Sequence, residues 1–269
     1  MKEGAGRSDV PKFAANLSTL FCELPFLDRF EAAAAAGFRA VECQFPYRYE
    51  TDQIAEQLRA LELSLVLLNL PAGDLASGDI GIAVDRGRVP ECREAIDQGL
   101  AYAATLECPM VHLLSGRLGP EIDSKSAIET YVEHLRYAAE QSADQGLKIL
   151  VEPFNATDVP GYLVSSADQA SDIIERTGSI RVGLQFDFYH AQMTHGDLAE
   201  SFRRHLDKIS HIQISGVPGR HEPDSGEINY PFLFDLVDTS GYEGYIGCEY
   251  HPAESTLKGL GWLEPYRPL

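Results

Sequence analysis

Basic residues are scarce in this chain of 269 amino acids. Its 22 lysines and arginines face 41 aspartates and glutamates, which gives a formal net charge of −19 at pH 7 with neutral histidines. A charge of this sign repels phosphate backbones and anionic lipid surfaces. We therefore expect no nucleic acid and no membrane among its partners. A small anionic substrate would also be repelled, so its binding requires local positive potential from a metal ion or an inward-facing arginine.

Paired cysteines, a signal peptide and membrane-spanning runs are missing as well. The five cysteines are an odd number and include no C-x-x-C pair, which favours a reducing compartment. The first nine residues are polar, and no apolar stretch approaches the ~18 residues of a membrane span. We expect a cytoplasmic protein in which residues 1–11 form a disordered leader.

Strand-like and helix-like segments alternate along the rest of the chain. The runs of strand formers lie roughly at residues 13–17, 40–45, 63–70, 110–115, 148–153, 182–187, 211–215 and 245–250. The segments between them have the spacing of helices and lie roughly at 25–36, 52–61, 88–106, 124–145, 167–177, 196–207, 230–239 and after 255. A chain of this length that is 44% hydrophobic can bury the core of one barrel. The pattern predicts an α/β fold, a single (β/α)8 TIM barrel over residues 12–269.

Four of the strand runs end in a side chain that can bind a metal ion, namely Glu152, Asp187, Gln213 and Glu249. One such residue is more often a helix N-cap or a solvated carboxylate than a ligand. These four are about 26 to 36 residues apart, enough each time for a helix and the next parallel strand, and every barrel strand delivers its last residues to the same rim. Three carboxylates and an amide oxygen form a hard ligand set. We predict one divalent ion, Mg²⁺ or Mn²⁺.

Short motifs around these positions resemble those of a known family. They are Phe13-Ala14-Ala15-Asn16-Leu17-Ser18, Phe45-Pro46-Tyr47, Asn69-Leu70-Pro71-Ala72-Gly73-Asp74, Val151-Glu152-Pro153, Asp187-Phe188-Tyr189-His190, Gly226-Glu227-Ile228-Asn229-Tyr230 and Gly247-Cys248-Glu249-Tyr250. Together they closely resemble the hydroxypyruvate isomerase family over about residues 12–266. The resemblance implies a xylose isomerase-like barrel.

This resemblance also implies an activity and residue roles. The metal positions of the family match Glu152, Asp187, Gln213 and Glu249, and its proton donor and acceptor match Glu152 and Glu249. Related sugar epimerases usually have histidine at the third ligand position, whereas Gln213 resembles the hydroxypyruvate isomerase branch. The implied reaction interconverts hydroxypyruvate and 2-hydroxy-3-oxopropanoate (tartronate semialdehyde). Because a proton must leave one carbon and return to its neighbour through an enediolate, two groups that handle protons are needed.

Two further residues are candidates for binding substrate. His190, three residues beyond Asp187, resembles the family's substrate-contacting histidine; the alternative is a hydrogen-bonded structural histidine. Arg220 lies in the loop after the seventh strand, and its guanidinium suits a carboxylate; the alternative is an exposed loop charge. We expect His112 to be a hydrogen-bonded core residue and His211 to lie one layer below Gln213.

Other functions stay open at this point. Residues 220–231 look like a 2-oxo-tetronate isomerase, whereas 152–155 and 158–161 look like the hydroxypyruvate branch; a ketose 3-epimerase is a further alternative. A related abasic-site endonuclease would require more histidine ligands and a basic surface. A non-catalytic barrel that binds sugar acids would not require two opposed glutamates. For each of the isomerase functions, we expect the partner to be a small oxo acid or sugar acid substrate. The sequence is also compatible with a homo-oligomer.

Overall fold

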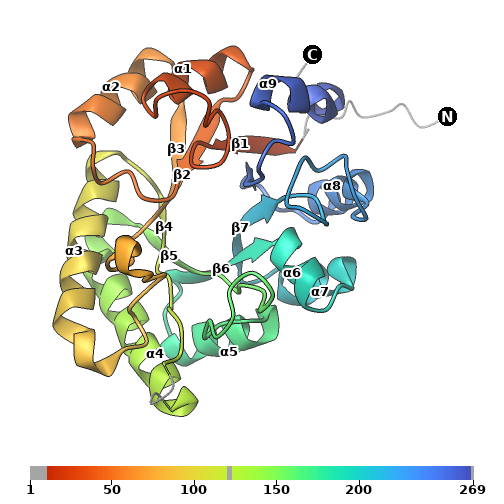
Figure 1. Ribbon diagram of the computed structural model, residues 1–269. Helices are drawn as coiled ribbons and strands as arrows, with labels where there is room; N and C mark the ends of the chain where they lie inside the picture. The colour runs from red at the N-terminus through yellow and green to blue at the C-terminus, as the bar shows by residue number, and fades with distance from the viewer. Residues whose placement is uncertain (1–10, 120–122, 268–269) are drawn as a thin grey trace.

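The strands form a closed parallel barrel in chain order, with β8 paired to β1 (Figure 1). The computed structural model describes residues 11–119 and 123–267. The strands are β1 (Lys12–Asn16), β2 (Ala40–Cys43), β3 (Ser64–Asn69), β4 (Met110–His112), β5 (Lys148–Val151), β6 (Val182–Asp187), β7 (Ile209–Ile214) and β8 (Tyr245–Cys248). The predicted (β/α)8 barrel is confirmed. The predicted leader over residues 1–11 lies outside the described residues except for Pro11.

Helices surround the barrel on its outside (Figure 1). They are α1 (Asp28–Ala35), α2 (Thr51–Ala60), α3 (Val89–Thr105), α4 (Ser124–Gln141), α5 (Ala167–Thr177), α6 (Phe188–Thr194), α7 (Leu198–His205), α8 (Tyr230–Thr239) and α9 (Thr256–Gly259). Short 3-10 turns are η1 (Leu75–Ser77), η2 (Arg86–Arg88), η3 (Ala143–Gln145) and η4 (Leu260–Tyr266). Within the described ranges, no helix has the length and apolar character needed to cross a bilayer.

The sequence pattern did not predict α6. This helix begins directly at the end of β6, because Asp187 is both the last residue of the strand and the N-cap of the helix. Its Oδ1 accepts a hydrogen bond of 2.7 Å from the backbone N–H of Tyr189. With no turn residue between strand and helix, the sequence lacks the punctuation that marks the other helix starts.

The core has two apolar layers. The outer one lies between strands and helices, where Phe13 of β1 packs edge-on against Phe234 of α8 and Trp262 of η4. The inner one is a smaller cluster formed by Ala14, Ala40, Val66, Leu67 and Leu150. Since side chains alternate along a strand, these apolar residues form a floor beneath the polar residues two positions further on, at Asn16, Glu42 and Glu152. The polar layer is therefore shielded from solvent on its lower side.

Candidate active site

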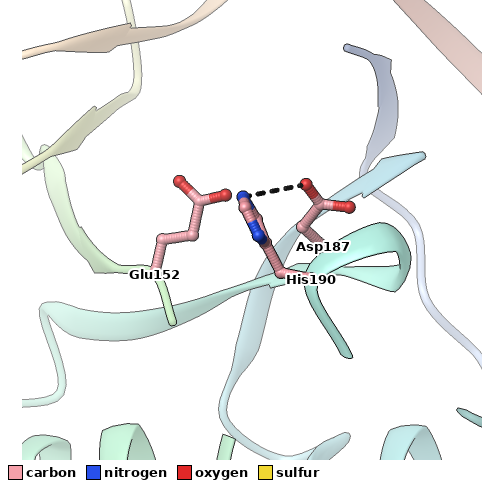
Figure 2. Close-up of side chains that lie close together, drawn as sticks. All are labelled: Glu152, Asp187 and His190. Atoms are coloured by element: carbon pink, nitrogen blue, oxygen red, sulfur yellow. Dashed lines mark ion pairs between the residues drawn. The ribbon is translucent and has the colours of Figure 1, made fainter. Parts of the chain in front are cut away.

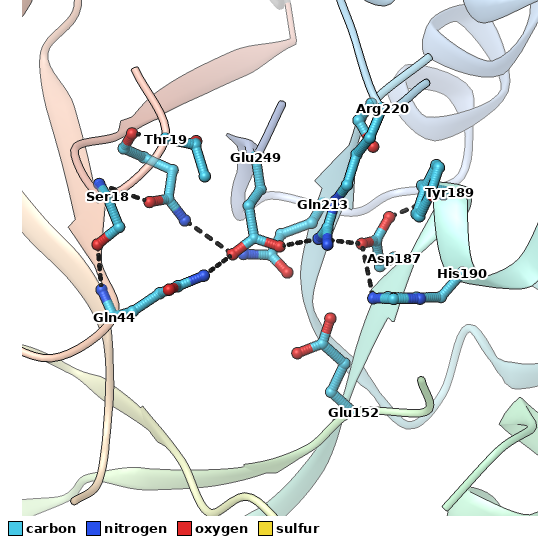
Figure 3. Close-up of polar contacts among 12 residues, drawn as sticks. Ser18, Thr19, Gln44, Glu152, Asp187, Tyr189, His190, Gln213, Arg220 and Glu249 are labelled. Atoms are coloured by element: carbon cyan, nitrogen blue, oxygen red, sulfur yellow. Dashed lines mark hydrogen bonds and ion pairs between the residues drawn. The ribbon is translucent and has the colours of Figure 1, made fainter. Parts of the chain in front are cut away.

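The four predicted ligand positions lie at the carboxyl ends of β5 to β8. Glu152 and Glu249 directly follow β5 and β8, and Asp187 pairs with Gln213 in the register of β6 and β7. All four side chains are buried. Figure 3 shows Glu152, Asp187, Gln213 and Glu249 directed toward a common interior space. The convergence expected from parallel barrel strands is therefore present in the structure.

Gln185 holds two of these side chains in place. Its Nε2 donates to Glu152 Oε2 at 2.7 Å and to Gln213 Oε1 at 2.6 Å. On the other side, Nε2 of Gln213 donates to Glu42 Oε1 at 2.7 Å. An amide held in this way has a fixed orientation, so the oxygen of Gln213 lies on the same side as Glu152.

Glu42 is a buried carboxylate that the sequence reading missed. It accepts from Asn16 Nδ2 at 3.0 Å, and its Oε2 lies 2.6 Å from His211 Nε2. The side chain of Glu42 fits here only because residue 247 is a glycine. A Cβ added to Gly247 would clash with Glu42 Oε2 at 2.3 Å. His211 thus lies below Gln213, as expected. The available signal was an acidic residue inside an otherwise apolar strand, which requires buried partners.

Glu249 is surrounded by donors. Its Oε1 accepts from Asn16 Nδ2 at 3.0 Å and from Gln44 Nε2 at 2.9 Å, and its Oε2 accepts from Arg220 Nη2. The same Nη2 lies 3.6 Å from Asp187 Oδ2, so the guanidinium lies between two carboxylates (Figure 3). Arg220 also lies over the ring of Tyr189, with Cζ 5.0 Å from the ring centre. Arg220 is thus a partly buried ion-pair residue and not an exposed loop charge.

Two carboxylate oxygens in the site lack hydrogen-bond donors. Glu152 Oε1 and Asp187 Oδ2 are buried and find no hydrogen-bond partner among residues 11–119 and 123–267. Glu152, Asp187 and His190 each have one atom that could bind a metal ion, and these three atoms all lie within 4.8 Å of one another (Figure 2). Buried, unsatisfied carboxylate oxygens are costly unless a cation binds them. The donor set therefore fits a divalent ion, and oxygen ligands favour a hard one.

The hydrogen bonds of His190 distinguish it from a metal ligand. Its Nδ1 accepts from the backbone N–H of Asn155 at 3.1 Å. Burial, with the added effect of Arg220, lowers the pKa of His190 well below its usual range, so the ring is neutral. A neutral imidazole that accepts at Nδ1 carries its proton on Nε2, the atom 3.8 Å from Asp187 Oδ2. His190 is thereby set up to donate a hydrogen bond into the site.

Burial changes the acidity of the carboxyl groups. It raises the pKa of Glu152 well above its usual value, and the charges of Glu249 and Asp187 raise it further. Burial also raises the pKa of Asp187 to about 7, although Arg220 opposes the shift. Burial therefore favours the protonated forms of both groups, whereas a bound cation would favour the ionised forms.

The metal-free protein is expected to lose stability as pH rises from about 4 to 7, relative to Asp187→Asn. Because the pKa of Asp187 is raised on folding, the folded protein binds more protons than the unfolded chain in this window, and its free energy of unfolding falls with pH. The difference should reach roughly 2–4 kcal/mol, at about 1.4 kcal/mol per pKa unit. Urea unfolding with a chelator measures it. Parallel profiles for the two proteins would show that Asp187 ionises normally.

The site opens into a cavity of about 200 Å³, a size suited to a small substrate. The polar residues that line it include Glu152, Glu249, His190, Arg220, Gln44 and Arg117. His112 lies beside it, with Nδ1 3.3 Å from Glu152 Oε2, and burial lowers its pKa to about 3. The expectation of a hydrogen-bonded His112 is wrong, since neither ring nitrogen has a hydrogen-bond partner in the described part of the chain.

Comparison with known proteins places this barrel among isomerases. Residues 30–266 match the family described as xylose isomerase-like TIM barrel. The chain is 45% identical over 257 residues to the 2-oxo-tetronate isomerase of Cupriavidus necator, covering 96% of this chain and 99% of that protein. It is 41% identical over 256 residues to the hydroxypyruvate isomerase of Escherichia coli, covering 95% and 99%. The chain belongs to the hydroxypyruvate isomerase family.

Membership of the hydroxypyruvate isomerase family confirms the resemblance drawn from the motifs. A solved structure shares this fold closely: the crystal structure described as AP endonuclease, family 2, from Brucella melitensis superposes with a TM-score of 0.94. It is 45% identical, and the match covers 96% of this chain and 100% of that one. The match therefore extends over nearly the whole chain.

Proposed function

We propose that this protein is a divalent-metal-dependent isomerase that interconverts hydroxypyruvate and 2-hydroxy-3-oxopropanoate. The observation that carries the proposal is a pair of buried glutamates, Glu152 and Glu249, that line one small cavity beside oxygen donors suited to a hard cation. Relatives named hydroxypyruvate isomerase and 2-oxo-tetronate isomerase, each matching nearly the whole chain, support it. Aldose–ketose interconversion requires two groups that handle protons on one substrate.

The ion would be held by Glu152, Asp187, Gln213 and Glu249, with Mg²⁺ or Mn²⁺ preferred by the oxygen ligands. When bound, it supplies stabilisation of the negative charge that develops on the substrate oxygens. Glu42 and Gln185 keep the amide of Gln213 in one orientation. Asp187 has one oxygen engaged by the N-terminus of α6 and the other available.

The reaction moves two protons. From hydroxypyruvate, a glutamate removes a proton from C3, the C–H electrons form the C2–C3 double bond, and the carbonyl electrons move to O2. The enediolate then receives a proton at C2. The hydroxyl proton on O3 is lost and O2 is protonated, so that C3 becomes the aldehyde carbon and C2 carries the hydroxyl group. His190 Nε2–H and the buried Nε–H of Arg220, which has no acceptor among the described residues, are donors for substrate oxygens.

Glu152 is the better candidate for removing the C3 proton. Its Oε1 accepts no hydrogen bond from the described residues, so no protein donor lowers the basicity of that oxygen. The oxygens of Glu249, in contrast, accept from Asn16, Gln44 and Arg220. We therefore assign proton return at C2 to the Glu249 side of the cavity.

Metal-stripped protein is expected to be inactive and to regain turnover with Mg²⁺ or Mn²⁺. The test adds Mg²⁺, Mn²⁺, Co²⁺ or Zn²⁺ separately and assays hydroxypyruvate and 2-oxo-tetronate, with uptake of deuterium from heavy water followed by NMR. Exchange at C2 and C3 is expected because the protons pass through ionisable side chains. Full activity in chelated protein, or turnover without any solvent exchange over many cycles, would contradict the mechanism.

The runner-up substrate, 2-oxo-tetronate, is favoured by the 45% identity to the Cupriavidus necator protein. One more hydroxymethyl-type carbon is a modest change for a pocket, so the ratio of kcat/KM values in the same assay decides between the two acids. A ketose 3-epimerase is less well supported, because Gln213 occupies the third ligand position, at which related epimerases usually have histidine. Abasic-site cleavage is disfavoured by the net charge of −19, and we expect no nicking of abasic duplex DNA.

A further inference from the structure

Arg117 is a cationic side chain on the cavity wall that has no anionic partner among the described residues. It lines the same cavity as Glu152, Glu249 and Arg220 but belongs to the loop after β4. Its side chain is exposed and makes no hydrogen bond or ion pair to any residue in 11–119 or 123–267. The chain has 41 acidic residues, and yet this arginine, which shares a cavity with two glutamates, forms no ion pair with the described residues. Its guanidinium is therefore available to bind a ligand.

The backbone that carries Arg117 is held on both sides. Arg117 forms an isolated antiparallel bridge with Tyr162, in which Leu118 N donates to Gly161 O at 2.8 Å and Leu163 N donates to Gly116 O at 3.0 Å. On the other side, the backbone of Gly116 packs closely against that of Gly81. A Cβ added to Gly116 would lie only 2.3 Å from the carbonyl oxygen of Gly81. The loops after β3, β4 and β5 are thus packed together. The base of the Arg117 side chain is fixed, which lowers the entropy cost of binding a ligand.

The other arginine of the cavity is already engaged. Nη2 of Arg220 donates to Glu249 Oε2 and lies 3.6 Å from Asp187 Oδ2. Its charge is therefore offset by two carboxylates, and a substrate carboxylate placed on it would compete with both. From the sequence, we expected Arg220 to bind the carboxylate of the substrate. The contacts instead leave Arg117 as the cavity-lining cation with an uncommitted charge among the described residues.

We propose that Arg117 binds the carboxylate of the substrate and makes the site selective for oxo acids over the corresponding neutral sugars. The proposal rests on the isomerase function above and assigns the two ends of the substrate to different groups. The reacting carbons lie at the glutamates, and the carboxylate lies at the loop after β4. A guanidinium offers a carboxylate two parallel hydrogen bonds, which a neutral hydroxymethyl group does not match.

Two substrate pairs isolate the carboxylate. Dihydroxyacetone and glyceraldehyde differ from hydroxypyruvate and 2-hydroxy-3-oxopropanoate by a hydroxymethyl group in place of the carboxylate. Arg117→Gln is expected to lower kcat/KM for the acids roughly 10- to 100-fold, mainly through KM, as for loss of a charged hydrogen bond, and to leave the neutral pair within about twofold. Arg117→Lys should recover part of the loss. An unchanged ratio of acid to neutral kcat/KM in Arg117→Gln overturns the assignment.

Arg86 provides the matched control. It is an exposed arginine in η2 that lies outside the walls of the cavity, and its side chain makes no ion pair or hydrogen bond with the described residues. Arg86→Gln removes the same charge from the same rim of the barrel, so it corrects for long-range electrostatics. Its kinetics are expected to match those of the wild type. A loss equal to that of Arg117→Gln would show a general charge effect and overturn the assignment.

Binding of an unreactive acid separates this proposal from the isomerase function. Calorimetry with glycerate and with glycerol, on Mn²⁺-loaded protein, is expected to show weaker glycerate binding in Arg117→Gln and no change in Arg86→Gln. Arg117-dependent glycerate binding without turnover of any oxo acid would reject the isomerase and keep the acid site. Turnover of oxo acids with equal glycerate affinity in wild type and Arg117→Gln would reject the role of Arg117 alone. Matching thermal unfolding curves confirm that the variants are folded.

Discussion

Replacing Glu152 with glutamine is expected to lower turnover by at least ~10²-fold, the lower end of what proton-transfer catalysis contributes. Glutamine keeps the length of the side chain and an oxygen for the metal, but it is not a base. The single amide oxygen has to serve both the metal and Gln185 Nε2, which now donates to Oε2, so metal affinity should also fall, though less than turnover. The measurement is kcat for hydroxypyruvate at saturating Mn²⁺, together with metal affinity by calorimetry.

Glu249→Gln is expected to lose activity to a similar degree, but here the loss of hydrogen bonds from neighbouring side chains contributes as well. Its carboxylate accepts from Arg220, and an amide there would have to present an oxygen to the guanidinium and to Asn16 at once. Glu56→Gln, on the exposed face of α2, is the control and should behave as the wild type. Solvent deuterium exchange distinguishes the two glutamates. Near-normal turnover of either site variant with saturating metal would make that residue a ligand only.

Removal of Arg220 is expected to lower kcat/KM by about 10²-fold, because breaking a buried ion pair costs on the order of 3 kcal/mol. Arg220→Ala leaves Glu249 without a donor at Oε2 and takes away the charge that opposes the raised pKa of Asp187. Arg220→Lys keeps a charge but loses the planar group over Tyr189, so it should recover part of the activity.

The losses in the Arg220 variants should be nearly equal for acid and neutral substrates, since the guanidinium acts on the carboxylates of the protein. This outcome is compared directly with Arg117→Gln, for which only the acids should suffer. If Arg220→Ala instead penalises the acids selectively and Arg117→Gln does not, the substrate carboxylate binds at Arg220. The same assay also reports metal affinity, which should change little in Arg117→Gln.

Much of the barrel could be predicted because its signals are local. Apolar runs bounded by turn residues mark each strand, and the alternation with helical segments leaves few topologies other than a parallel barrel. The prediction failed at α6, where one residue, Asp187, ends β6 and caps the helix without an intervening turn. Such a junction has no composition signal of its own.

The order of strands along the chain is enough to predict that Glu152, Asp187, Gln213 and Glu249 share one rim, because parallel strands of a barrel all end on the same side. The contacts that each of these side chains makes became visible only in the folded barrel. Glu42 meets Gln213 across the barrel although 171 residues separate them, and Gln185 joins Glu152 to Gln213. These contacts depend on barrel closure and on how side chains from non-neighbouring strands fill its interior, which strand periodicity does not encode.

The two arginines illustrate the same division. Sequence reading could place Arg220 on the rim, because the loop after a barrel strand faces the cavity, but it could not tell a bound guanidinium from a free one. The structure pairs Arg220 with Glu249 and leaves Arg117 without a partner among the described residues. The charge available to a substrate depends on distances between side chains of different loops, and those distances are set only when the loops after β3, β4 and β5 pack together.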